Sequence, residues 1–221
     1  MGTRTADWKD IISLSSSYPD RILPSFGLHP WWAHENQGNW EDELAALLAS
    51  HPHACVGEIG LDKQWVPPEC VEVQYEAQME VFKKQLDLAT RLKRPVSLHC
   101  VAAYGDMFDA LRLASDLPPA IYMHSFGGKA GMLNSFVKMK NYGDRFYFGF
   151  SAAINLRSPK TSDVIKLVPD KRLLIESDLE DPSEVRPCLA RMLHVIAESK
   201  GWTLEQAAAQ TSSNARAFLR S

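Results

Sequence analysis

The sequence lacks the features that would place it in a membrane, secreted or multidomain class. No hydrophobic run approaches the roughly 18 residues of a membrane span, and the opening "MGTRTADWKD" has no apolar signal-peptide core. No linker rich in proline, glycine or serine divides the 221 residues, and no internal repeat is visible. We therefore expect a single domain, residues 1–221, without a membrane partner.

Disulfide motifs and excess positive charge are also missing. The four cysteines, Cys55, Cys70, Cys100 and Cys188, lie far apart with no C-x-x-C pair, in a chain too long to need disulfides for stability. This pattern favours a reducing compartment, the cytoplasm or the nucleus. The net charge of −3 excludes a broad basic face for non-specific duplex binding, so any nucleic-acid contact must be local or made through bound cations.

What the chain does contain is a regular alternation of strand and helix patterns. Short β-branched or apolar runs predict strands at 22–28, 54–59, 95–99, 120–124, 146–150 and 172–177. Helical periodicity occupies 7–17, 40–50, 70–93, 103–116, 129–141, 161–168, 183–200 and 203–219. Strands that alternate with helices indicate an α/β fold of parallel βα repeats.

Polar residues follow these predicted strands at the ends where they finish. Glu58, His99, His124 and Asp178 each fall at or just beyond the carboxyl end of a strand, as does His29 in "GLHP". In parallel α/β barrels these ends open onto one face, where active-site residues converge. One such His could be structural, but five polar residues at equivalent ends favour a site. Two His, one Glu and one Asp are a suitable ligand set for Zn²⁺, Mn²⁺ or Mg²⁺.

The stretch "CVGEIGLDKQ" carries the least expected of these residues. Glu58 interrupts an otherwise apolar strand pattern, and a buried, unpaired carboxylate would be costly. A carboxylate that holds cations is compensated, so we interpret Glu58 as a metal ligand.

Six segments together resemble a known family. "GLHPWW", "GEIGLD", "SLHC", "MHSFGG", "YFGFSA" and "LLIESD" occur in the order and approximate spacing of the TatD-type metal-dependent deoxyribonucleases, which are amidohydrolase-like TIM barrels. The match runs from about residue 7 to 219. The combination of "GEIGLD", two strand-end histidines and "ESD" is specific, whereas any one segment alone would be weak.

The resemblance implies a divalent-metal-dependent deoxyribonuclease that hydrolyses DNA phosphodiester bonds exonucleolytically, on single strands or ends. Glu58 would bridge two ions, Mg²⁺ or alternatively Zn²⁺ or Mn²⁺, with His99, His124 and Asp178 as further ligands. Two cations about 4 Å apart orient a water molecule, lower its pKa and stabilise the transition state at phosphorus. Asp178 would also accept the proton of that water.

Other residues would contact substrate. His29 would line the site, and Lys63, Lys129 and Arg157 could hold phosphates, although each cation could equally be a solvated surface residue. Trp31 and Trp32 could stack on unpaired bases or simply cover the barrel mouth.

The chain departs from the family at its N-terminus. The family opens with a strand that carries H-x-H, which supplies two ligands, and has a second strand before "GLHP". We find neither in this sequence. We therefore expect about six of the eight strands and an N-terminal truncation relative to the family. We expect an incomplete barrel in which 22–28 is an exposed edge strand, with Ile22, Leu23, Phe26 and Leu28 short of partners. Such an edge would allow self-association.

Two further functions stay open. The same ligands would activate water against another ester or amide bond. Alternatively, a truncated chain of low or no activity would act through interactions.

Overall fold

The structure is a computed structural model that describes residues 1–35 and 38–221. It has an α/β architecture, as expected, and every strand predicted from the sequence is present. The chain separates into two compact units, Met1–Ile121 and Tyr122–Ser221. Within the described residues, no helix is both long and apolar enough to cross a membrane.

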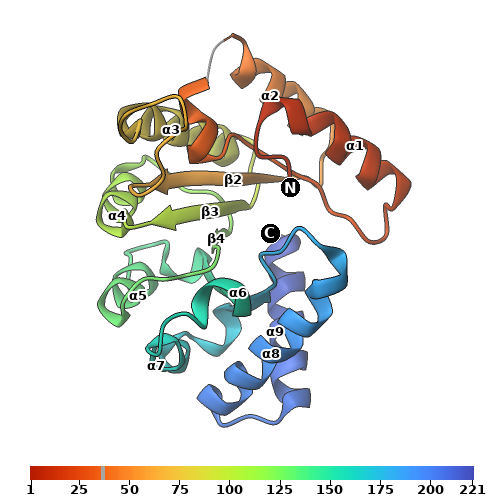
Figure 1. The fold of residues 1–221 in the computed structure, drawn as a ribbon, viewed down its shortest axis with the longest axis vertical. Coiled ribbons are helices and arrows are strands. Elements are labelled where there is room, and N and C mark those ends of the chain that lie inside the picture. Colours follow the sequence, from red (N-terminus) through yellow and green to blue (C-terminus); the bar gives the residue numbers. More distant parts are fainter. Residues whose placement is uncertain (36–37) are drawn as a thin grey trace. The chain divides into compact units, whose positions relative to one another are not determined.

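The first unit begins with helices and a short strand, followed by βα repeats (Figure 1). Neighbouring strands pair in chain order, β1–β2–β3, and both pairings are parallel. Its strands are β1 (Ser25–Phe26), β2 (Cys55–Asp62) and β3 (Val96–Val101), and β4 (Ile121–Met123) starts at its last residue. Its α-helices are α1 (Trp8–Ser17), α2 (Trp40–Ser50), α3 (Tyr75–Arg91) and α4 (Tyr104–Leu113), with 3₁₀ turns at Thr5–Asp7 and Pro30–Glu35.

Strand β2 is buried along its whole length because β1 and β3 flank it and α3 packs against it (Figure 1). It continues past the predicted end at residue 59, since Gly60 and Asp62 still pair with His99 and Val101 of β3. Glu58 and His99 therefore lie inside their strands rather than at the ends, which corrects the sequence expectation.

Helix α3 also holds the backbone near these residues. Its buried positions recur every three or four residues, which is the period of a helix face against a sheet. Two of them are glutamines: Gln85 accepts from the Leu28 N–H (2.7 Å) and donates to the Leu28 carbonyl (3.0 Å), while Gln78 accepts from the Asp62 N–H (2.7 Å). These bonds satisfy backbone groups that the strands leave unpaired.

The expected open edge at residues 22–28 is only partly observed. The strand is confined to Ser25–Phe26, and Gly2 forms a parallel bridge to Phe26, so the first residues of the chain occupy that edge. Phe26 and Leu28 are buried, whereas Leu23 is exposed. The expectation that Phe26 and Leu28 lack partners was wrong, and with it the structural reason given for self-association.

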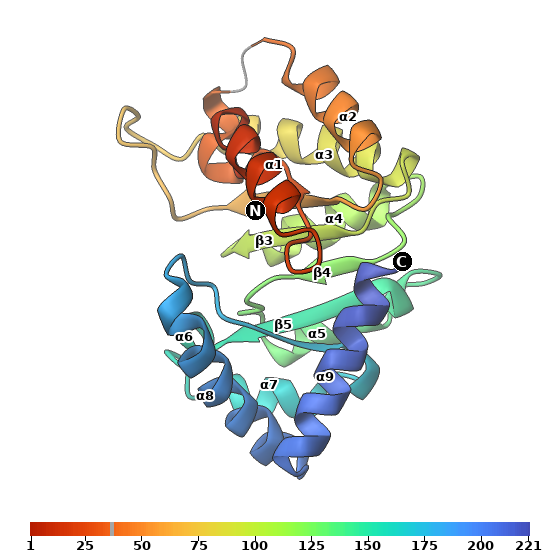
Figure 2. The same ribbon diagram turned by 90° about the vertical axis from the view of Figure 1, so that its right-hand side faces the viewer.

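The second unit repeats the βα pattern and ends in two long helices, α8 and α9, which pack side by side (Figures 1 and 2). Its strands pair in the order β4–β5–β6, and β5–β6 is parallel. The elements are β5 (Phe146–Ser151), β6 (Leu173–Glu176), α5 (Ala130–Val137), α6 (Ala152–Asn155), α7 (Thr161–Leu167), α8 (Pro182–Lys200) and α9 (Leu204–Leu219), with 3₁₀ turns at Gly143–Arg145 and Asp170–Arg172.

Local signals in the sequence account for the ends of α8 and α9. Asp181 caps α8 by accepting from the Ser183 N–H, and Gly201 ends that helix in the left-handed conformation. Thr203 and Gln206 form a capping box at the start of α9. Asn214 of α9 donates to the carbonyls of Asp170 and Leu173, which anchors the helix where β6 begins.

Candidate metal centre

The first unit brings His29, Glu58 and His99 together. Their ligand atoms lie within 4.8 Å of one another. Glu58 Oε1 is 3.0 Å from His99 Nδ1 and 3.7 Å from His29 Nε2, and the two imidazole rings meet edge to face at 4.4 Å. His29 and Glu58 are buried. Glu58 is thus a buried carboxylate with two imidazole rings close to it.

His29 differs from His99 in the hydrogen bonds of its ring. The backbone N–H of Trp31 donates to His29 Nδ1 (3.2 Å), so the proton of the neutral ring is on Nε2, facing Glu58. Burial, the largest influence, lowers the pKa of His29 below its ordinary value, although the hydrogen bond with Glu58 opposes the shift. His29 is therefore a neutral donor aimed into the site and is unsuited to be a metal ligand through Nε2.

Asp62, at the end of β2, belongs to the same cluster, although it was not among the site residues predicted from the sequence. Its Oδ2 is 3.1 Å from His99 Nε2 and accepts from Trp31 Nε1 (2.9 Å). Its Oδ1 accepts from the backbone N–H groups of Gln64 (2.8 Å) and Trp65 (3.1 Å). The sequence signal for Asp62 was the aspartate that ends "GEIGLD", since it places an acid in a strand that is buried throughout.

The charges of this cluster depend on hydrogen bonds that oppose desolvation. Burial alone would raise the pKa of Asp62, but the bonds from His99, Trp31 and the backbone outweigh it and hold that pKa far below its ordinary value. Burial alone would lower the pKa of His99, but the bonds to Asp62 and Glu58 raise it overall. These hydrogen bonds therefore favour the ionised form of Asp62.

The second unit contains a matching group at the ends of β4 and β6. His124 follows β4, and its Nδ1 is 2.7 Å from Glu176 Oε2. Its Nε2 is 3.5 Å from Asp178 Oδ1, two residues beyond β6. Asp178 has a positive φ of 55°, a conformation that Asp tolerates better than most residues. Burial alone would raise the pKa of Glu176, but His124 and the surrounding donors lower it.

Each unit therefore pairs an expected histidine ligand with an expected carboxylate ligand: His99 with Glu58, and His124 with Asp178. Imidazole nitrogen next to carboxylate oxygen is a donor set that suits Zn²⁺ and Mn²⁺, and the carboxylates suit Mg²⁺. The residues of both clusters consequently fit a divalent cation.

The expected phosphate-binding cations have different surroundings. Lys63 Nζ is 2.6 Å from Asp106 Oδ2 and lies over the Tyr75 ring, so its charge is already paired. Lys129, just before α5, and Arg157, just after α6, are exposed. Trp31 stacks on Trp65 with ring centroids 5.3 Å apart.

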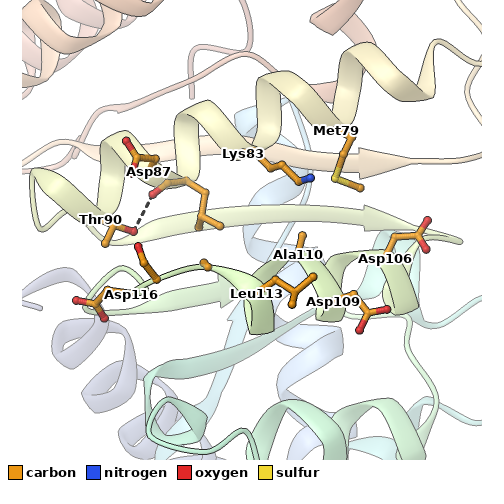
Figure 3. A pocket seen from close by; sticks show the side chains of 12 residues that line it. Met79, Lys83, Asp87, Thr90, Asp106, Asp109, Ala110, Leu113 and Asp116 are labelled. Atoms are coloured by element: carbon orange, nitrogen blue, oxygen red, sulfur yellow. Dashed lines mark hydrogen bonds between the residues drawn. The ribbon is translucent and has the colours of Figure 1, made fainter.

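A groove of about 540 Å³ lies between α3 and α4 of the first unit (Figure 3). Met79, Lys83 and Asp87 line it from α3, and Asp106 and Leu113 from α4. The residues that line it include none of the expected ligands, so the chemistry of the two clusters does not involve this groove.

Comparisons with known proteins agree with the fold, and relatives from Bacillus subtilis and Mycobacterium tuberculosis are named metal-dependent hydrolases. The sequence profile described as "TatD related DNase" matches residues 1–220. The Cut9-interacting protein scn1 of Schizosaccharomyces pombe is 29% identical, over 100% of this chain and 90% of that protein. A protein of Erwinia tasmaniensis named 3'-5' ssDNA/RNA exonuclease TatD is 29% identical, over 97% of this chain and 85% of that protein. The crystal structure of YJJV, a TatD homologue from Escherichia coli, superimposes with a TM-score of 0.84 at 26% identity, covering 100% of this chain and 85% of that one.

Proposed function

Because the chain belongs to the TatD-related DNase family of metal-dependent hydrolases and nucleases, we propose that it is a divalent-metal-dependent exonuclease that hydrolyses phosphodiester bonds of single-stranded DNA. The observation that carries the proposal is the pairing of a histidine with a carboxylate in each unit, at His99–Glu58 and His124–Asp178. The name of the Erwinia relative supports a 3' to 5' direction and adds RNA as a second substrate to be tested.

In this proposal Glu58, His99, His124 and Asp178 hold two divalent ions, with Mg²⁺ the first choice and Zn²⁺ or Mn²⁺ the alternatives. When bound, the metal would lower the pKa of a water molecule and stabilise the charge that develops at phosphorus. Asp178 accepts a proton from the attacking water. At the same time the water oxygen bonds to phosphorus, and the P–O bond to the leaving nucleotide breaks. His29 donates from Nε2 to a phosphate oxygen, and Lys129 and Arg157 neutralise phosphate charge.

A nuclease assay on stripped protein tests the proposal. Protein freed of metal with a chelator is incubated with a 5'-labelled single-stranded oligonucleotide and Mg²⁺, Mn²⁺ or Zn²⁺ in turn. We expect a ladder of products shortened from the 3' end, only with metal, and a loss of several orders of magnitude in Glu58→Ala. The control is Glu72→Ala, which removes an exposed glutamate of the same unit. Equal cleavage by both variants, or cleavage without metal, would contradict the proposal.

A second candidate is an interaction role, favoured by the match to a fission yeast protein whose name records binding to Cut9 and which this chain covers at 90% of its length. In that case the chain binds a protein partner and its turnover is dispensable. Replacing the gene with the Glu58→Ala allele separates the two: a phenotype equal to deletion supports the nuclease, and a wild-type phenotype supports the interaction role.

The proposal also includes one working domain in the cytoplasm or nucleus. The family profile extends through both compact units, and the four cysteines are free thiols. Protein reloaded with metal should consequently lose its activity when the expected ligands of either unit are replaced, Glu58 and His99 in the first or His124 and Asp178 in the second.

A further inference from the structure

We propose that Asp62 and Glu176 are positioning residues that set the tautomers of His99 and His124, so that each histidine presents an unprotonated nitrogen beside a metal-binding carboxylate. The inference rests on the proposed metal centre. Neither acid is among the expected ligands, and each is joined to one of the two histidines by a hydrogen bond.

Asp62 accepts hydrogen bonds from three residues besides His99. Trp31 Nε1 and the backbone nitrogens of Gln64 and Trp65 can only donate, so both oxygens of Asp62 act as acceptors. An acceptor oxygen 3.1 Å from His99 Nε2 requires that this nitrogen carry the proton. Asp62 is 3% exposed, so water cannot readily replace these donors.

The tautomer of His99 has a direct consequence at its other nitrogen. A neutral imidazole protonated on Nε2 has a lone pair on Nδ1, and this atom lies 3.0 Å from Glu58 Oε1. When no metal is present Glu58 Oε1 accepts a hydrogen bond from a proton on Nδ1, and a divalent cation at that position would replace the proton and bind both atoms. A carboxylate that fixes the far nitrogen of a metal-binding histidine also increases the basicity of the near one.

Glu176 fixes the tautomer of His124 in the same way, but it bonds to Nδ1 of the ring rather than to Nε2. Its Oε1 accepts from the Ser125 backbone N–H (2.5 Å) and lies 3.0 Å from the Ser125 hydroxyl. Its Oε2 is 2.7 Å from His124 Nδ1, which therefore carries the proton. The lone pair is on Nε2, 3.5 Å from Asp178 Oδ1. In both units the histidine lies between a positioning acid and an expected carboxylate ligand. The positioning acid bonds to Nε2 in the first unit and to Nδ1 in the second.

The bonds that position the histidines also separate these acids from the ligands. Both oxygens of Asp62 are occupied by donors from three other residues as well as His99, and both oxygens of Glu176 are occupied by Ser125 and His124. Direct coordination by either acid would break several of these bonds at once. Asp62 and Glu176 therefore act through the histidines.

The first test reads the tautomers of the wild-type protein directly. Long-range ¹H–¹⁵N correlation spectra of the metal-free wild type, at a pH where both imidazoles are neutral, report which nitrogen carries the proton. His99→Gln and His124→Gln assign the signals. We expect the Nε2–H tautomer for His99 and the Nδ1–H tautomer for His124. The opposite tautomer at both rings would overturn the proposal.

The second test uses two nearly isosteric variants, Asp62→Asn and Glu176→Gln. Each introduces an amide NH₂, which is a donor, into a ring of donors. We expect Asp62→Asn to alter the tautomer signals of His99 but not those of His124, and Glu176→Gln to do the reverse. Calorimetric affinity for Mn²⁺ should fall about 10- to 100-fold in each. Asp109→Asn and Glu72→Gln, at exposed positions, are the matched controls and should change neither signals nor affinity.

The outcomes distinguish this proposal from the proposed function. Weakened Mn²⁺ binding with unchanged tautomers in both variants would mean a merely structural role and overturn the positioning proposal. Expected tautomers in a protein that binds no divalent metal would contradict the nuclease proposal alone. Tight metal binding with reversed wild-type tautomers would contradict the positioning proposal alone.

Discussion

The two histidines of the first-unit cluster, His29 and His99, differ in the hydrogen-bond partners of their ring nitrogens. His29 accepts from the Trp31 N–H and so keeps its proton on Nε2, whereas His99 has a carboxylate at each nitrogen. The two imidazoles are only 4.4 Å apart, yet hydrogen bonding gives them different chemistry. In the proposed metal centre, a histidine beside a carboxylate would serve as a ligand when its other ring nitrogen donates to an acceptor.

This difference predicts the behaviour of His29→Gln. The variant should keep its affinity for Mn²⁺ within about threefold, because His29 is a donor and does not coordinate metal. Its kcat/KM for a single-stranded oligonucleotide should fall about tenfold, the effect of one lost hydrogen bond of about 1.4 kcal/mol to a phosphate. Calorimetry and steady-state kinetics measure the two effects.

His99→Gln is the comparison for this variant, since it should lose both metal affinity and turnover. A large loss of Mn²⁺ affinity in His29→Gln would show that His29 is a ligand after all.

The thiol of Cys55 supplies a prediction about pH. Burial raises its pKa from 9.0 to about 12, because the thiolate has no water around it in the folded protein. A group with a raised pKa stabilises the fold fully below the unfolded value and progressively less as the pH rises above it. The free energy of unfolding should therefore decrease between about pH 9 and pH 12.

Cys55→Ala, studied by urea denaturation across this pH range, should show a shallower decrease than the wild type, although the lost side-chain volume makes it less stable at neutral pH. The control is Val56→Ala, which removes a buried, non-titrating side chain next to Cys55 and should keep the wild-type slope. Identical slopes in all three proteins would contradict the assignment to Cys55.

At the scale of the elements, the contact between β2 and β3 positions the first-unit cluster. Gly60 pairs with His99, and a Cβ built on Gly60 would lie 1.9 Å from the His99 carbonyl oxygen. Its φ of +150° is also one that residues with a side chain rarely adopt. The close approach therefore requires glycine and fixes the height of His99 relative to Glu58.

Gly60→Ala should consequently separate the strands at His99. We expect a loss of about 1–3 kcal/mol in the free energy of unfolding, together with weaker Mn²⁺ binding, because the imidazole moves away from Glu58. Chemical denaturation and calorimetry measure both.

Gly131→Ala in α5 is the control, since a Cβ there meets no atom within 4 Å. It should be neutral or stabilising by up to about 1 kcal/mol. Equal behaviour of the two alanine variants would show that the close approach at Gly60 is unimportant.

At the scale of the whole molecule, charge limits how the proposed polyanionic substrate would be held. The net charge is −3, Lys63 is paired with Asp106, and the clusters themselves are rich in carboxylates. Attraction for phosphates must come mainly from bound cations and a few exposed basic side chains.

The salt dependence of activity should accordingly be shallow. With one or two phosphates neutralised by side chains, log(kcat/KM) plotted against log[KCl] should have a slope no steeper than about −1.5 for a single strand at constant Mg²⁺. Lys129→Ala or Arg157→Ala should reduce that slope by about 0.7, whereas Lys83→Ala in the α3–α4 groove should leave it unchanged. A slope several times steeper would show a basic surface of a different kind.

The sequence by itself was sufficient for the order of strands and helices, because apolar periodicity and capping residues act locally. Helix α2 spans the predicted 40–50, and α8 and α9 begin within one residue of the predicted 183 and 203, directly after the capping residues Asp181 and Thr203. It also identified Glu58, His99, His124 and Asp178 as candidates, since a polar residue in or just after a buried strand stands out in the letters alone.

Tertiary structure decided the rest, because it depends on atoms brought together from distant parts of the chain. The bridge from Gly2 to Phe26 occupies an edge that the strand count left open. The strands run past their predicted ends because Gly60 and Asp62 find partners in β3, some 40 residues later. The roles of Asp62 and Glu176 depend on which nitrogen of a histidine 37 or 52 residues away lies within hydrogen-bonding distance, and no sequence period records that distance.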